Sequence, residues 1–218
     1  MAHVLRYIFE HVAQVFAADK SPNRSINMDS EPMTAPYYTD PATSTYKVKP
    51  VSFVFSDDGL VPNNPLPFLL YKSAIAVDAG EAEDIVESLF LTNGWAQTWR
   101  NGIFDYCHYH ATVHEVLGVA SGRALVRFGG AHGEELELRK GDVAILPAGT
   151  GHQRLSASAD FRVVGAYPPG PEMEITRPTP DNYRKALLTI PKVVLPVTDP
   201  VYGPNGPLVT LWAKPAKP

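Results

Sequence analysis

The fold is decided by residues 102–115, GIFDYCHYHATVHE, together with a second stretch at residues 141–152, GDVAILPAGTGH. The first stretch contains His108 and His110 and ends on a glutamate, and the second ends on His152. Three imidazoles and one carboxylate suit a first-row divalent metal ion when a fold brings them into one cavity. The two stretches therefore predict a metal site.

The pair His108 and His110 supplies half of this site. We expect a strand over residues 104–110, and a strand places alternate side chains on the same face, so the two imidazoles project together. Tyr106 shares their face, whereas Cys107 points away from the cavity, where it is expected to be a packing thiol.

The next expected strand, residues 115–120, can turn either His114 or Glu115 inward. Leu117 and Val119 share the face of Glu115 and suit a barrel interior. The residues between His110 and Glu115 also leave room for a turn. We therefore predict Glu115 as the fourth ligand, with His114 as the alternative.

The second stretch delivers His152 after a sequence rich in glycine, which permits a sharp corner beside the metal. Arg154 shares the parity of His152 and can face the same cavity. Tyr106 and Arg154 are therefore the predicted catalytic side chains, the first donating a hydrogen bond to a bound ligand and the second holding a carboxylate. A structural role in supporting the metal ligands is the alternative for each.

The remaining histidines are not ligand candidates. A lone buried histidine is more often a hydrogen-bonded core residue, and only the combination of all four ligands favours metal. His132 lies in a glycine-rich turn, where it is expected to be solvated, and His3 and His11 belong to an expected N-terminal helix.

Composition excludes several classes of partner. The 218 residues carry 19 basic and 23 acidic side chains, a net charge of -4, which leaves no basic surplus for nucleic acid. No apolar run approaches the ~18 residues of a membrane span. Cys107 is the only cysteine, so no intrachain disulfide can form, and we expect a cytoplasmic location.

Two regions are expected along the chain. Residues 1–50 form an extension, with an amphipathic helix at 2–18 and a linker rich in proline and serine. Residues 51–213 form a single domain with a proline-rich C-terminal arm.

One helix is expected at residues 81–94 and a short one near 181–188. The pattern predicts strands over residues 51–55, 68–77, 95–99, 104–110, 115–120, 123–128, 134–139, 143–146, 153–156 and 161–167. Short strands in such close succession indicate an all-β antiparallel sandwich or barrel.

The histidine stretches resemble the two motifs of the cupin superfamily. The first motif is matched at every position and the second at all but one, where Ser156 replaces asparagine; the matching residues are Gly102, His108, His110, Glu115, Gly122, Gly141, Pro147, Gly149 and His152. Further segments, among them VPNNPLPFLLYK and VVGAYPPG, resemble the small bacterial cupins of the YjlB-like group over about residues 51–212. The resemblance implies a double-stranded β-helix, the cupin jelly roll, with a divalent metal bound by His108, His110, Glu115 and His152.

The expected function is that of a metal-dependent oxidoreductase of the dioxygenase type that acts on a small oxygen-chelating substrate, by analogy with cupins of the same ligand set. An isomerase or decarboxylase of a small hydroxy or keto acid is the alternative, as is a non-enzymatic cupin that binds a small molecule. The ligands alone do not choose among Fe, Mn, Ni, Cu and Zn. We expect a homodimer, because cupins commonly pair through their sheets.

Overall fold

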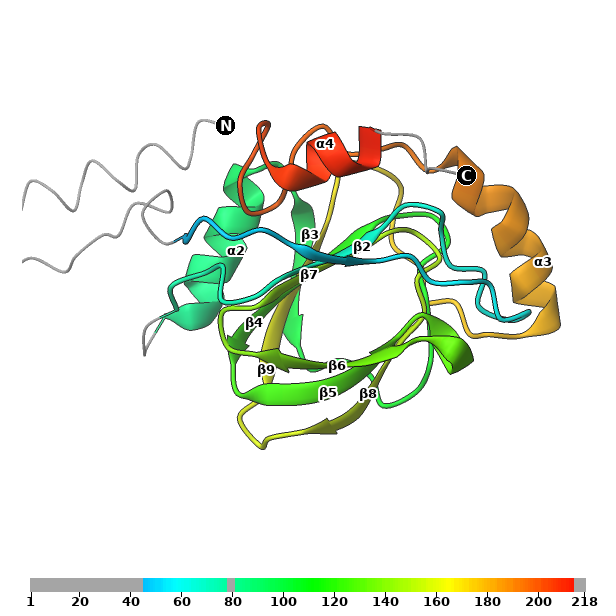
Figure 1. The fold of residues 1–218 in the computed structure, drawn as a ribbon, viewed down its shortest axis with the longest axis horizontal. Coiled ribbons are helices and arrows are strands. Elements are labelled where there is room, and N and C mark those ends of the chain that lie inside the picture. Colours follow the sequence, from blue (N-terminus) through cyan, green and yellow to red (C-terminus); the bar gives the residue numbers. More distant parts are fainter. Residues whose placement is uncertain (1–44, 78–80, 214–218) are drawn as a thin grey trace, which may run out of the picture. The chain divides into compact units, whose positions relative to one another are not determined.

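The computed structural model describes residues 45–77 and 81–213 of the chain (Figure 1). All described residues belong to one compact unit of the chain. The amphipathic helix expected at residues 2–18 lies outside the described residues. The helices of the described residues are all too short or too polar to cross a bilayer.

The described residues form two antiparallel sheets. The six-stranded sheet has the order β1-β2-β7-β4-β9-β3 and the three-stranded sheet the order β6-β5-β8. The strands are β1 (Val51–Phe53), β2 (Phe68–Tyr71), β3 (Ala96–Asn101), β4 (Glu115–Ser121), β5 (Arg123–Phe128), β6 (Glu134–Arg139), β7 (Val143–Leu146), β8 (His152–Ala157) and β9 (Arg162–Tyr167). Figure 1 shows the smaller sheet lying across the larger one, which is the arrangement of a double-stranded β-helix.

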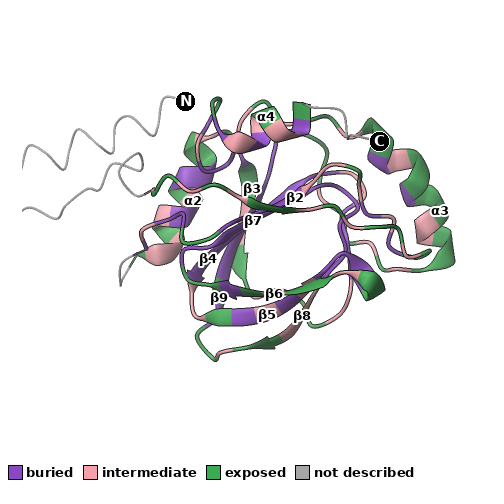
Figure 2. Ribbon diagram, viewed as in Figure 1, coloured by how far each residue is buried: buried purple, intermediate pink, exposed green. Residues whose placement is uncertain are grey.

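The interior between the sheets is filled by alternate residues of each strand. On β4, Leu117 and Val119 face this interior, where they meet Val126 and Phe128 of the opposite sheet. The sheet residues of this inner core are Phe68, Leu70, Leu117, Val119, Ala124, Val126, Phe128, Leu138, Ala144, Leu146 and Val163. Figure 2 shows that β4 and β7 are buried along their length, because both faces of these central strands are covered.

The outer face of the large sheet is covered by helices. Helix α2 (Ala82–Thr92) packs Val86 and Phe90 against β4, so closely that a Cβ on Gly118 would lie 2.5 Å from Val86 Cγ1. The helix has acidic residues in its first turn, which suits its dipole, and Gly94 follows it with a left-handed φ of 80°. This helix is where the sequence predicts it.

The C-terminal arm contains more helix than expected. Helix α3 (Pro180–Thr189) begins at an N-cap, Thr179, whose side chain accepts a hydrogen bond from Asn182 N, and the helix confirms the expectation near residues 181–188. Helix α4 (Pro207–Ala213) was not predicted. It buries Leu208 and Trp212 in the same outer core as α2. Two short 3₁₀ turns cover Gly130–His132 and Ile190–Lys192.

The N-terminal edge of the domain lies earlier than residue 51. The backbone of Tyr46 donates to Ala74 O over 2.8 Å, and the hydroxyl of Tyr202 bridges Val48 N and Tyr46 O. Residues 45–48 are thus tied to the same domain as the strands.

Candidate metal centre

The segment that carries His108 and His110 is not a strand, which corrects the expectation for residues 104–110. It makes only isolated bridges, His108 with His152 and Tyr109 with Thr176. The segment lies beside β8, to which Phe104 O and His108 are bonded, but it forms no continuous ladder with a strand of the described residues. The two bridges still keep the backbone extended at residues 108–110, so both histidines point into the interior as predicted.

Backbone carbonyls hold the three imidazoles in one tautomer. Each Nδ1 lies within hydrogen-bonding distance of a carbonyl oxygen: His108 with Tyr106 O at 3.1 Å, His110 with Glu174 O at 2.8 Å and His152 with Thr150 O at 3.2 Å. A carbonyl only accepts, so each Nδ1 carries the proton and each Nε2 presents a lone pair. The three histidines are buried, and their ligand atoms lie within 4.8 Å of one another. They could hold a metal ion, and the carbonyls are the partners that metal-binding histidines commonly have.

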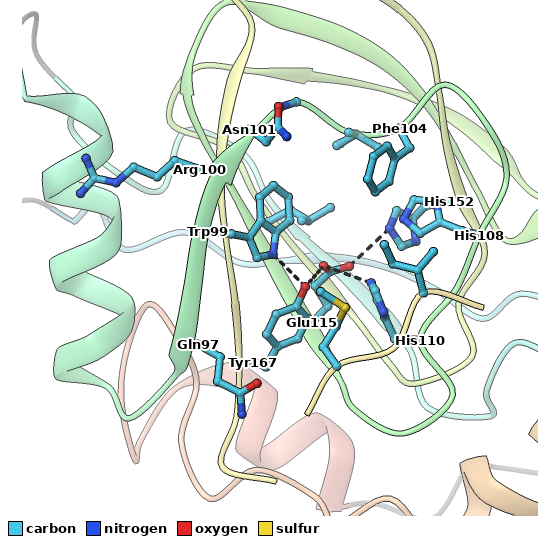
Figure 3. A pocket seen from close by; sticks show the side chains of 15 residues that line it. Gln97, Trp99, Arg100, Asn101, Phe104, His108, His110, Glu115, His152 and Tyr167 are labelled. Carbon is cyan, nitrogen blue, oxygen red and sulfur yellow. Dashed lines mark hydrogen bonds and ion pairs between the residues drawn. The ribbon is translucent and has the colours of Figure 1, made fainter. Parts of the chain in front are cut away.

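Glu115 lies beside this group and contacts two of its members. Its Oε1 is 3.3 Å from His110 Nε2, and its Oε2 is 3.4 Å from His152 Nε2 (Figure 3). Tyr167 donates its hydroxyl to Oε1 over 3.0 Å. Oε2 has no hydrogen-bond partner, although Glu115 is only 2% exposed. A buried carboxylate oxygen without a donor is costly unless a cation neutralises it, so the donor set fits a divalent metal.

The electrostatics of the site favour an ionised carboxylate among imidazoles. Burial opposes ionisation of Glu115, but the charge and hydrogen bond of His110, with His152 and His108, lower its pKa to about 2. Burial and the neighbouring His108 lower the pKa of His152 to about 3. Burial also lowers the pKa of His108. For His110 burial is outweighed by the charge and hydrogen bond of Glu115, which raise its pKa. A metal bound here competes with a proton at His110.

His114 turns away from this site. It is 1% exposed, and its Nδ1 accepts a hydrogen bond from Ala148 N at 3.0 Å. Its ring lies 4.7 Å from that of Trp212, and burial lowers its pKa to about 4. The structure thus places Glu115, and not His114, beside the other three predicted ligands.

The histidines and Glu115 line a cavity of about 320 Å³. The predicted catalytic residues Tyr106 and Arg154 do not line it, which corrects their expected positions. Arg154 Nε donates to Ile103 O over 2.8 Å, and Tyr106 lies under the guanidinium of Arg177 at 3.9 Å. Parity predicted that both side chains would face the cavity, but Arg154 bonds to a backbone carbonyl and Tyr106 stacks with Arg177. The roles predicted for them stay predictions.

Cys107 does not line this cavity either. It contacts a separate hollow and packs with the buried cluster of Val61 and Tyr109. His132 is exposed, as expected for a turn. His3 and His11 lie outside the described residues.

The sequence did not indicate Trp99 and Tyr167, which complete the site. Trp99 Nε1 donates to the Tyr167 hydroxyl over 2.7 Å, and Tyr167 in turn donates to Glu115. A bulge in β3 lies between Ala96 and Trp99, with Gln97 at a φ of 51°, and Trp99 pairs opposite Gly165. For Tyr167, the sequence offers one signal, since Tyr167 lies on the same face of its strand as Val163. Both faces of that strand are equally apolar, so the pattern does not show which face turns inward.

Replacing Tyr167 with phenylalanine is expected to weaken metal binding by about 10- to 100-fold, because Glu115 and the Trp99 indole both lose their partner. Burial and the charge of Glu115 raise the pKa of Tyr167, so its hydroxyl stays a donor at neutral pH. The affinity is measured by competition with a chelator. Tyr183→Phe is the matched control, since it removes a tyrosine–carboxylate bond to Asp57 on the surface. Equal affinities in the two variants would contradict the role given to Tyr167.

A double-stranded β-helix that carries a His-x-His pair, a glutamate and a third histidine between its sheets is a cupin. The chain is 38% identical over 164 residues to the uncharacterized protein YjlB of Bacillus subtilis (strain 168), a match that covers 75% of this chain and 96% of that protein. The chain therefore belongs to the YjlB family of cupins, and the resemblance of its motifs is confirmed. No family model matches the chain.

Solved structures are similar at low identity. A protein with a double-stranded beta-helix domain from Klebsiella pneumoniae is 15% identical, with a TM-score of 0.31, covering 66% of this chain and 99% of that one. Acireductone dioxygenase from Bacillus anthracis, solved with a cadmium ion in its active center, is 18% identical, with a TM-score of 0.29, covering 44% of this chain and 60% of that one.

Proposed function

We propose that this chain is a metal-dependent oxidoreductase of the dioxygenase type that acts on a small oxygen-chelating substrate. The observation that carries the proposal is the donor set: three buried imidazoles whose ligand atoms lie within 4.8 Å of one another and a carboxylate oxygen without a hydrogen-bond partner, all on the wall of one cavity. His108, His110, Glu115 and His152 would hold one divalent metal, Fe, Mn, Ni, Cu or Zn. Four protein ligands leave positions for water or substrate in an octahedron.

A metal in this place supplies Lewis-acid activation of bound oxygen atoms and, where the ion is redox-active, electrons for dioxygen. The residues of the chain contribute position and environment. The backbone carbonyls orient the imidazoles, and Tyr167 holds Glu115 by Oε1 and leaves Oε2 facing the histidines. The surrounding apolar side chains limit water, which strengthens every charge interaction inside the cavity.

An isomerase or decarboxylase of a hydroxy or keto acid receives less support. Arg154, the residue predicted to hold the substrate carboxylate, does not line the cavity, and its Nε donates to Ile103 O. A non-enzymatic cupin that captures a small molecule is consistent with the same metal ligands. A homodimer and a cytoplasmic location stay predictions.

Two measurements test the proposal. Elemental analysis of the full chain, purified without an affinity tag, is expected to find about one first-row metal ion per chain. Oxygen uptake is then followed with a panel of diols, phenols and keto acids, with His152→Ala as the inactive reference. Conversion of a keto acid without oxygen uptake would favour the isomerase or decarboxylase instead. Absence of any bound metal would overturn the proposal.

A further inference from the structure

We infer that the cavity selects a flat, apolar substrate of about one ring, which chelates the metal through oxygen atoms and carries no acidic tail. This inference rests on the proposed function, because it assumes a metal at the histidines. It depends on three features of the cavity: aromatic and aliphatic walls, a tryptophan that is held rigidly, and nearby arginines that are already bonded or stacked with other groups of the protein.

Much of the wall of the cavity away from the metal ligands is apolar. Figure 3 shows Trp99 and Phe104 on different sides of the space in front of the histidines. Phe104 is 40% exposed and Ile175 is 43% exposed, so these two large apolar side chains of the cavity are accessible to solvent. The apolar lining consists of Trp99, Ile103, Phe104, Leu117, Met173 and Ile175. Open apolar side chains around a concave site are typical of a surface that an apolar ligand covers.

Trp99 is fixed before any ligand arrives. Its Nε1 donates to Tyr167, so its only polar atom is already bonded. Its ring also occupies the space beside Gly165, where a Cβ would lie 2.1 Å from Trp99 Cε2. The indole therefore presents an apolar face in one orientation, which lowers the entropic cost of stacking a planar ligand against it.

The cationic side chains around the cavity are not available to an acidic ligand. Arg100, the only arginine or lysine among the described residues that line it, points toward α2 (Figure 3), where Nη2 donates to Asp84 Oδ1 at 2.6 Å and also to Glu87. Glu83 lies 3.9 Å from its Nη1. Three carboxylates thus surround one guanidinium, and the local charge is negative.

Two further arginines lie close by and are also engaged. Arg154 donates to Ile103 O, and Arg177 covers the ring of Tyr106. A carboxylate or phosphate tail in the cavity would therefore be desolvated without a cationic partner, which is strongly unfavourable. A divalent metal and the Glu115 carboxylate together carry one net positive charge, and the chelating oxygen atoms of the substrate would bind to that charge.

The volume limits the size of the substrate. About 320 Å³ is at the lower end of the range for small-molecule sites. One ring with small substituents fits such a space. The amides of Gln97 and Asn101 also line the cavity, and Asn101 Oδ1 accepts from Gly102 N, which leaves its NH2 group for an uncharged polar substituent.

The test uses the full chain loaded with cobalt(II), whose visible spectrum changes when a ligand enters its coordination shell. The protein is titrated without oxygen with 4-methylcatechol, which is a flat ring with two chelating oxygen atoms, and with 3,4-dihydroxybenzoate, which has the same ring and diol but carries a carboxylate in place of the methyl group. We expect 4-methylcatechol to bind at least about tenfold more tightly than 3,4-dihydroxybenzoate. Phe104→Ala and Trp99→Ala are each expected to weaken 4-methylcatechol by about tenfold while cobalt remains bound.

Matched variants separate the possible outcomes. Leu188→Ala, at a side chain of α3 that is 70% exposed, is expected to leave both titrations unchanged. Trp99→Phe keeps a ring and is expected to recover part of the affinity lost in Trp99→Ala, and Phe104→Ala carries the test alone if Trp99→Ala does not fold. Equal or tighter binding of 3,4-dihydroxybenzoate, or unchanged 4-methylcatechol affinity in the Phe104 variant, would overturn the inference and leave the metal centre standing. A cobalt spectrum that His152→Ala does not alter would instead overturn the proposed function, and this inference with it.

Discussion

Replacing His152 with alanine is expected to lower metal affinity at least about a hundredfold, so that the purified chain no longer holds stoichiometric metal. His152 is 2% exposed, and its ring lies 4.0 Å from that of His108, centroid to centroid. Its backbone also pairs with His108, so a side chain further along β8 cannot take its place. The fold should survive, because the main-chain bridge is kept. Elemental analysis and chelator competition measure the change.

His108→Ala is expected to behave in the same way, since both imidazoles belong to the group whose ligand atoms lie within 4.8 Å. The matched control is His132→Ala, at an exposed turn, which should retain the wild-type metal content. Added metal should raise the melting temperature of the control but not of the His152 variant, because only a bound ligand stabilises the folded state. If His108→Ala and His152→Ala both kept one metal ion per chain, the site would be misplaced.

Replacing Asp199 with alanine is expected to reduce the free energy of unfolding by about 3–5 kcal/mol. Asp199 is fully buried, and its Oδ2 accepts from the Tyr71 hydroxyl at 2.5 Å and from Leu208 N at 3.1 Å. Its Oδ1 accepts from Val201 N and Tyr202 N. One carboxylate thus ties β2 to the loop that leads into α4. Without it, four donors lose their acceptor in the interior.

Urea unfolding of the full chain measures this loss. Asp199→Asn keeps one acceptor oxygen and is expected to lose less stability than Asp199→Ala. Asp181→Ala is the matched control, because Asp181 is paired with Arg184 on the surface, where its side chain is 79% exposed. A change of less than about 1 kcal/mol in Asp199→Ala would mean that α4 is held by its apolar contacts alone.

Local sequence predicted the strands of the two sheets because their patterns are strong. The strands β5, β6 and β7 begin and end where the alternation and the glycine corners predict. Helix α2 was equally clear, since its apolar face, acidic first turn and following Gly94 agree with one another. The sequence did not predict helix α4, which is short and follows a proline- and glycine-rich loop. It is stabilised by the packing of Trp212 and not by its own helix propensity.

The wider surroundings of the site could not be predicted in the same way. Parity states which face of the chain a side chain occupies, but not where a long polar side chain finds its partner. Arg154 therefore bonds to the carbonyl of Ile103 and does not line the predicted cavity. Trp99 lines the cavity because a bulge shifts the register of β3 by one residue. The sequence of residues 95–101 does not predict that bulge.

The sequence by itself determined the candidate metal donors of this cupin: the residue types, their spacing in two motifs, and the choice of Glu115 over His114 by its apolar neighbours. These follow from the fixed periodicity of an extended chain. Only the tertiary structure decided what surrounds the donors, namely the hydrogen bonds from Trp99 to Tyr167 and from Tyr167 to Glu115, and the pairing of Arg100 with carboxylates of α2. The reason is that these contacts join residues far apart in the chain, whose meeting depends on strand register and on the cost of burying a charge.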